Sequence, residues 1–383
     1  MCDYKEQFLL MLKSALNNEK LPDGFSFDAD RVFVLAQLHN MLPFVFEKAL
    51  ETDIDVLLYK KKVVRLCSLQ INKNQLFRSI YEKMLQNGLN PLVVKGPVCA
   101  GTYKTDHYRL SSDFDIVFPE SDADKFDAFF CQYGFDKKGC AYISEKTGLY
   151  IETSYCLGEG ADVYAQNADN VFNGFFDRAI VIDGYRTLSH NDHFAYLIYH
   201  AFKHFIGSGF GVKQLADMYM YMLRYNHELD YSKVLLLIDQ VGIRSFADNC
   251  FYAISRIFDY KCELTPEANS PYICYDVFVN DLLDAGVFGK STEDRLHSAS
   301  VVYNAVSEEG KKNLLRTLFP SFSYMKNRFS ILNHLPFLLP VFWIVRIFCY
   351  LVDSVSGKKE TSPVRSIEIA NERIDLMKKM GII

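Results

Sequence analysis

The sequence predicts an α+β protein, in which a mixed sheet with flanking helices lies between helical regions at both ends of the chain. Three observations support this prediction. Apolar residues recur at helical spacing up to Gly88, short apolar runs typical of strands follow within residues 89–187, and helical spacing returns after residue 188. The 383 residues are enough for two or three compact units, because a single core rarely grows beyond about 250 to 300 residues.

The first helical region covers residues 1–88. Its apolar residues recur every three or four positions in long stretches, and Gly88 follows the last stretch as glycine commonly follows a helix. The formal net charge of the chain is −5, and its lysine runs are short. We therefore expect no extended duplex nucleic acid as a partner, and a small or compact acceptor instead.

The predicted core covers residues 89–187 and begins with a buried strand, LNPLVVKG. A short helix follows, then a strand in SSDFDIVFPESD, a helix that ends before Gly134, and a strand in GLYIETSYCL. Residues 188–310 are predicted to form a helical domain that completes the cleft. Residues 311–383 are predicted to form a C-terminal helical segment.

One apolar stretch, residues 335–352, is long enough to raise the question of a membrane. Arg346 lies inside it, and Pro336 and Pro340 interrupt its first turns. A central arginine costs about 2.5 to 3.5 kcal/mol in a spanning helix, so we expect a buried or interfacial helix. Peripheral contact of this stretch with a membrane or a partner protein stays open as an alternative.

The cysteines and the first residues bear on the compartment. The ten cysteines form no C-x-x-C pair, which argues against a zinc ribbon and a disulfide framework. The apolar run near the start is too short for a secretion signal. We expect a cytoplasmic protein, with membrane association through residues 335–352 as the alternative.

Two carboxylates are the first candidates for chemistry. On a strand, Asp113 and Asp115 project to one face while Phe114 points to the other, so both carboxylates can meet one cation. Magnesium prefers hard oxygen ligands and usually takes one or two carboxylates, with water and phosphates completing its shell. An Asp-x-Asp by itself more often marks a turn or an exposed strand edge, so the interpretation depends on its surroundings.

A third acid is needed if two metal ions are to act together, about 3.5 to 4 Å apart. Glu152 is the candidate, because it lies on a later predicted strand. If the strands pair in register, its side chain projects to the same face of the sheet as the two aspartates. Asp113, Asp115 and Glu152 are thus the predicted catalytic residues and metal ligands, and Glu152 either completes the second metal site or serves as a base toward the acceptor. We expect two Mg²⁺ ions, with Mn²⁺ as the alternative.

The order of these parts resembles the DNA polymerase beta-like nucleotidyltransferase superfamily. Its pattern is a glycine turn, an acid-x-acid strand and a third acid on a later strand. More narrowly, the chain resembles a poorly characterised bacterial family of nucleotidyltransferases with an L-K-G turn and an R-x-x-x-D-x-D strand. Here the turn reads Val94-Lys95-Gly96, and the strand runs from Arg109 to Asp115.

The resemblance implies a polymerase beta-like core that transfers a nucleoside monophosphate from a nucleoside triphosphate to an acceptor hydroxyl, with release of pyrophosphate. It leaves the acceptor open among small molecules, sugars, RNA ends and proteins. It also implies that His200, Lys203 and His204 line the nucleotide cleft, followed by a helix with a buried aspartate, Asp217. A core or structural role for each histidine is the alternative.

Charge suggests the roles of the remaining residues. Lys95 and the backbone at Gly96 are expected to hold the triphosphate, and Arg109 either clamps a phosphate or orients Asp113. One departure from the family pattern is Pro97, which removes a backbone donor from the phosphate cradle. Because of this departure, a catalytically inactive nucleotide-binding or regulatory protein on the same fold stays open as an alternative.

Overall fold

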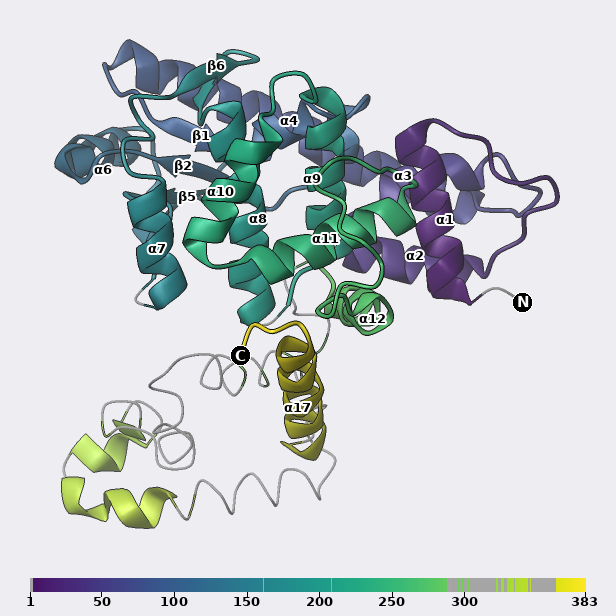
Figure 1. Ribbon diagram of the computed structural model, residues 1–383. Coiled ribbons are helices and arrows are strands. Elements are labelled where there is room, and N and C mark those ends of the chain that lie inside the picture. Colours follow the sequence, from purple (N-terminus) through teal and green to yellow (C-terminus); the bar gives the residue numbers. More distant parts are fainter. Residues whose placement is uncertain are drawn as a thin grey trace. The chain divides into compact units, whose positions relative to one another are not determined.

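The computed structural model describes residues 3–160, 162–207, 209–287 and 363–383, together with scattered residues between 292 and 345. Contacts within the chain define two compact units (Figure 1). The first comprises Met1–Ala201 and Val212–Ser270, and the second comprises Phe202–Gly211 and Pro271–Ile383. The predicted α+β class is confirmed, while the four regions expected from the sequence stay a prediction.

The first unit opens with helices, as the sequence predicts. They are α1 (Tyr4–Asn17), α2 (Ala29–Leu38), α3 (Leu42–Ala49) and the long α4 (Leu57–Gln86). The side chain of Asp28 caps α2 by accepting the Arg31 N–H at 3.1 Å. Gly88 follows α4 with φ +75°, a left-handed conformation that glycine adopts at little cost.

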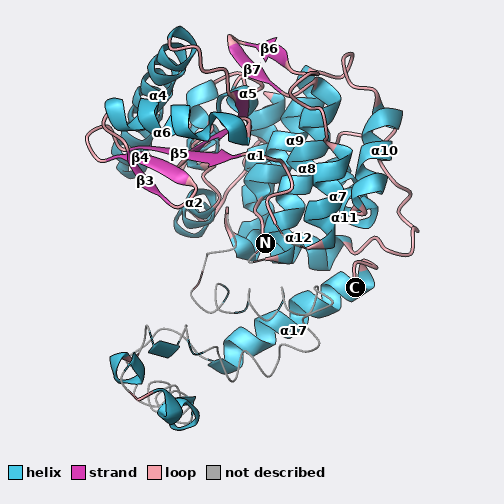
Figure 2. Ribbon diagram, turned by 90° about the vertical axis from the view of Figure 1, so that its left-hand side faces the viewer, coloured by secondary structure: helices cyan, strands magenta, loops and turns pink. Residues whose placement is uncertain are grey.

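This unit contains a five-stranded mixed sheet (Figure 2). Its order is β1-β2-β5-β4-β3, and β2 runs parallel to β5 while the other neighbours are antiparallel. The strands are β1 (Leu92–Val94), β2 (Phe114–Val117), β3 (Asp136–Lys138), β4 (Ala141–Ser144) and β5 (Leu149–Ser154).

The register of β2 and β5 separates an apolar face of the sheet from a polar one. Phe114 lies opposite Ile151, and both are buried. Phe77 of α4 covers this face, with its ring stacked on Phe114 at 4.2 Å between centroids. The next pair along the strands is Asp115 and Glu152, which therefore point to the opposite face.

The remaining elements of the first unit are helices and a second, two-stranded sheet of β6 and β7. Tyr219, Tyr221 and Tyr225 are buried. The elements are α5 (Gly96–Ala100), η1 (Asp106–Tyr108), η2 (Glu120–Asp122), α6 (Ala123–Gln132), α7 (Val163–Val171), β6 (Ile180–Ile182), β7 (Tyr185–Thr187), α8 (His190–Ile206), α9 (Val212–Arg224), α10 (Tyr231–Val241) and α11 (Arg244–Ile257), and the last turn of α8 belongs to the second unit.

In the second unit, buried Arg373 donates to the backbone oxygens of Phe205 and Gly207, the latter at 2.6 Å. Of the apolar stretch, the structure describes residues 335–343 and 345, so the predicted helix lies partly outside the described residues. None of the described helices is both long and apolar enough for a membrane span. The described elements are α12 (Tyr275–Ala285), η3 (Ser330–Asn333), η4 (Pro336–Leu338) and α17 (Pro363–Lys379).

Candidate functional site

The turn after β1 has an unusual backbone. Lys95 has φ +60° and ψ −126°, a backbone conformation that residues other than glycine rarely adopt. Two contacts hold it: the Lys95 N–H donates to His193 Nε2 at 3.1 Å, and the Gly96 carbonyl accepts from Arg109 Nη1 at 3.2 Å. Strain that surrounding contacts maintain in this way is most often found at functional sites.

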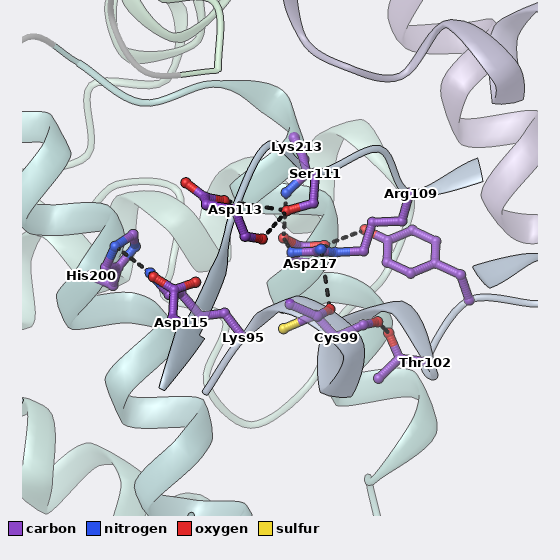
Figure 3. A network of polar contacts seen from close by, with 12 residues as sticks. Lys95, Cys99, Thr102, Arg109, Ser111, Asp113, Asp115, His200, Lys213 and Asp217 are labelled. Atoms are coloured by element: carbon purple, nitrogen blue, oxygen red, sulfur yellow. Dashed lines mark hydrogen bonds and ion pairs between the residues drawn. The ribbon is translucent and has the colours of Figure 1, made fainter. Parts of the chain in front are cut away.

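The Lys95 side chain reaches the polar face of the sheet. Its Nζ lies 2.8 Å from Asp115 Oδ1 and 2.7 Å from His200 Nε2 (Figure 3). Burial lowers the pKa of Lys95, but the nearby charges of Asp115, Asp113 and Glu159 outweigh burial and raise the pKa overall. The ammonium is therefore charged at neutral pH and balances part of the carboxylate charge.

The predicted carboxylates do come together on this face. Burial first, and then the charge of Asp113, raise the pKa of Asp115, although Lys95 opposes them. Burial and the charge of Asp115 raise the pKa of Glu152. Ser111 Oγ donates to the Asp113 carbonyl at 2.9 Å and contacts Asp113 Oδ1 at 3.3 Å. Burial, together with the neighbouring negative charges, disfavours the ionised form of these carboxylates, which a bound cation would stabilise.

Glu159 is a further carboxylate of this site that the sequence analysis missed. Its charge helps raise the pKa values of Asp115 and Glu152, and its φ is +50°. The Tyr199 hydroxyl fixes the loop by donating to the Gly158 carbonyl at 2.6 Å. The signal in the sequence is the acid between two glycines, Gly158-Glu159-Gly160, directly after a predicted strand.

Arg109 and Asp217 form a buried bidentate pair beside the turn. Arg109 Nε donates to Asp217 Oδ1 at 2.7 Å and Nη2 donates to Oδ2 at 2.8 Å, and both side chains are buried. The Tyr103 hydroxyl donates to Oδ1 at 2.7 Å, and Lys213 Nζ lies 3.5 Å from Oδ2. Burial raises the pKa of Asp217, but Arg109 and Lys213 outweigh it and lower the pKa to about 2.

This pair bears on the predicted role of Arg109. Arg109 has a structural partner, which is Asp217 of α9 and not Asp113, and its third contact supports Gly96. The guanidinium therefore ties α9 to the Lys95-Gly96 turn. A contact of Arg109 or Asp217 with nucleotide stays a prediction.

The histidines of α8 fall into two groups. His193 is fully buried, and burial followed by nearby positive charges lowers its pKa to about 3, so it is neutral. His200 meets Lys95, as described above. Lys203 and His204 lie on the last turn of α8, in the second unit, and their predicted place in the nucleotide cleft stays a prediction.

The donor chemistry fits magnesium in one particular way. Within the described part of the chain, no group of three or more His, Cys, Asp or Glu side chains is arranged to hold a metal by itself. The hard oxygens of Asp113 and Asp115 nevertheless suit an ion that draws its other ligands from water and phosphate. These residues thus fit magnesium that arrives with a nucleotide, and fit a self-sufficient metal site less well.

Comparison with known proteins adds one finding. The family described as "Uncharacterised nucleotidyltransferase" matches residues 26–259, which include every strand of the sheet, helix α8 and helix α9. No curated protein matches the chain, and no solved structure matches it.

Proposed function

Because the chain belongs to the family of uncharacterised nucleotidyltransferases, we propose that it transfers a nucleoside monophosphate from a nucleoside triphosphate to an acceptor hydroxyl. The observation that carries this proposal is the pairing of Asp115 with Glu152, with the Lys95 ammonium 2.8 Å from Asp115. A reaction at a metal-bound phosphate requires carboxylates that lie close together and a positive charge nearby, which Asp115, Glu152 and the Lys95 ammonium provide.

The proposed reaction balances as follows. The acceptor oxygen forms a bond to the α-phosphorus, the bond between that phosphorus and the bridging oxygen breaks, and pyrophosphate leaves with the electron pair. Glu152 takes the proton of the acceptor hydroxyl. Its raised pKa suits this role, because a base with a higher pKa holds the proton more firmly.

Asp113 and Asp115 would hold Mg²⁺, with two ions expected and Mn²⁺ as an alternative. When bound, the ions neutralise the charge that develops on the phosphates and the leaving pyrophosphate. Lys95 supplies a further positive charge on the same side of the sheet. The proposal extends nucleotide contact to Gly96 and His200, and to Lys203, His204, Arg109 and Asp217 as the family resemblance implies.

The acceptor is proposed as a small molecule, a sugar, an RNA end or a protein, and not as an extended duplex. The formal net charge of −5 argues against the broad basic surface that duplex binding needs. We propose a cytoplasmic location, with peripheral membrane or protein contact through residues 335–352 as the alternative. Removal of that stretch and fractionation of cells would separate the two.

The test is calorimetric titration of each of the four nucleoside triphosphates, with magnesium, into wild type and an Asp113→Asn/Asp115→Asn variant. Pyrophosphate release is followed in parallel across candidate acceptors. A matched control is Asp124→Asn/Asp136→Asn, which removes two exposed carboxylates elsewhere in the same unit. Metal-dependent binding and release that only the site variant loses would support the proposal, and no metal-dependent binding would refute it.

A second candidate is a nucleotide-binding or regulatory protein without turnover. The observations in its favour are Pro97, which lacks the N–H that a phosphate cradle uses, and the engagement of Lys95 with Asp115. Metal-dependent binding of a nucleotide, with no pyrophosphate released from it in the presence of any acceptor, would favour this candidate over the transferase.

A further inference from the structure

Lys95 is bound differently through its backbone and through its side chain. The backbone is held on both sides, by His193 at the Lys95 N–H and by Arg109 at the Gly96 carbonyl. Both holding side chains are buried, so this part of the turn cannot shift without disturbing the core. The side chain, in contrast, ends between two separate acceptors.

The two acceptors of the Lys95 ammonium differ in charge and in proposed role. Asp115 is the residue proposed to bind the divalent cation, and its Oδ1 now accepts from Lys95 at 2.8 Å. His200 Nε2, at 2.7 Å from the same nitrogen, is uncharged as an acceptor and lies on α8, not on the sheet. An ammonium has three donors, so it can stay bonded to His200 after it leaves the carboxylate.

We infer that the Lys95 ammonium is an exchangeable counter-ion, which neutralises Asp115 in the empty site and withdraws to His200 and to nucleotide phosphate when a divalent cation binds. This inference rests on the proposed function. The ammonium and a divalent cation cannot share Asp115 Oδ1 closely, because like charges repel most strongly where water is excluded. His193 and Arg109 act as positioning residues, since they keep the turn in place while the side chain moves.

The exchange has a thermodynamic consequence. Without nucleotide, a cation must displace the ammonium from Asp115, so metal affinity is reduced. With nucleotide, the displaced ammonium gains a phosphate oxygen, so metal and nucleotide strengthen each other's binding by the same factor. This coupling explains why the carboxylates fit magnesium that arrives with a nucleotide.

The test is the affinity for Mn²⁺ alone, measured by the electron paramagnetic resonance signal of the free ion. Lys95→Met is expected to bind Mn²⁺ about fivefold more tightly or better, a typical size for coupling between sites. His200→Ala is expected to bind it more weakly, because the displaced ammonium loses its second acceptor. The exchange thus predicts that Mn²⁺ affinity rises in Lys95→Met and falls in His200→Ala. A simple effect of removing one positive charge would account for the first change but not for the second.

Two further variants secure the result. Lys95→Gly also removes the ammonium, and glycine suits the positive φ of this position, so it serves if Lys95→Met does not fold. Lys125→Met breaks a lysine–aspartate pair at 2.7 Å on the surface, and it should leave the Mn²⁺ affinity unchanged.

Unchanged or weaker Mn²⁺ binding in both Lys95 variants would overturn the exchange, and so would an absence of Mn²⁺ binding in every variant. The proposed function is judged separately, by magnesium-dependent nucleotide binding and pyrophosphate release in the wild type. The exchange can therefore fail while the transferase activity stands.

Discussion

Asp115 of β2 lies directly opposite Glu152 of β5, in the one parallel pair of the five-stranded sheet. The two residues are far apart in the chain, and the crossover from β2 through α6 to β5 brings them together. The charge of Asp115 contributes to the raised pKa of Glu152, so a cation bound beside Asp115 would favour the ionised form of Glu152. The predictions below follow from this relationship and from the contacts around it.

Replacement of the proposed base should separate binding from turnover. Glu152→Gln is expected to bind magnesium and nucleotide but to lose about 10²- to 10⁴-fold in the rate of pyrophosphate release, the usual contribution of a general base. Rapid-quench kinetics at saturating nucleotide measure this rate. Wild-type turnover in Glu152→Gln would show that Glu152 is not the general base.

Removal of Glu159 should shift the pH dependence of the reaction. The charge of Glu159 contributes to the raised pKa of Glu152, so Glu159→Gln is expected to lower that pKa. Glu152 would then stay ionised at lower pH, and the acid limb of the pH–rate profile would move to lower pH. Glu145→Gln, an exposed acid in the turn between β4 and β5, is the control. A shift of the acid limb to higher pH would contradict the prediction.

The buried pair of Arg109 and Asp217 should dominate the stability of the turn. Asp217→Ala leaves a buried guanidinium without its partner, and is expected to lower the free energy of unfolding by about 3 to 5 kcal/mol. Denaturant titration measures this loss. The control is Asp239→Ala, which removes an exposed partner of Arg244 and should cost about 1 kcal/mol or less. Equal losses in the free energy of unfolding in the two variants would contradict the dominant role of the Arg109–Asp217 pair.

His193 should make stability depend on pH. Its pKa is about 3 in the folded protein, against an ordinary value of 6.5, so the unfolded chain takes up a proton below pH 6.5 that the folded protein refuses. Its contribution to stability is complete above pH 6.5 and falls as the pH falls toward 3. Between pH 7 and pH 5 the wild type should lose up to about 2 kcal/mol more than His193→Gln, whose amide can still accept the Lys95 N–H. Parallel pH profiles would contradict this.

The polar face of the sheet could be predicted from the sequence, because strand alternation and register are local properties. Asp115 and Glu152 share a face for this reason, because β2 and β5 pair in the register that places them opposite each other, while Asp113 directly precedes β2. Glu159 was missed because its position depends on a strained loop, for which the flanking glycines are only a weak signal.

The partners of the basic residues could not be predicted in the same way. Arg109 and Asp217 are separated by 108 positions, and periodicity says nothing about which remote helix supplies a counter-charge. One of the two roles expected for Arg109 was to orient Asp113, four residues further along the chain, whereas the structure pairs it with a buried aspartate that accepts from two guanidinium donors at once. The contact of Lys95 with His200 likewise depends on how α8 packs.

The central claim is most directly tested by the fate of the α-phosphate. Each of the four nucleoside triphosphates, labelled at that phosphate, is incubated with magnesium and with fractions of small molecules, RNA or protein. We predict that one nucleotide transfers its label to an acceptor in wild type and in Asp124→Asn/Asp136→Asn, but not in Asp113→Asn/Asp115→Asn. In a parallel set the nucleotides are labelled at the γ-phosphate instead. Transfer of the γ-label but not of the α-label, or no transfer of the α-label from any of the four nucleotides, would contradict the account.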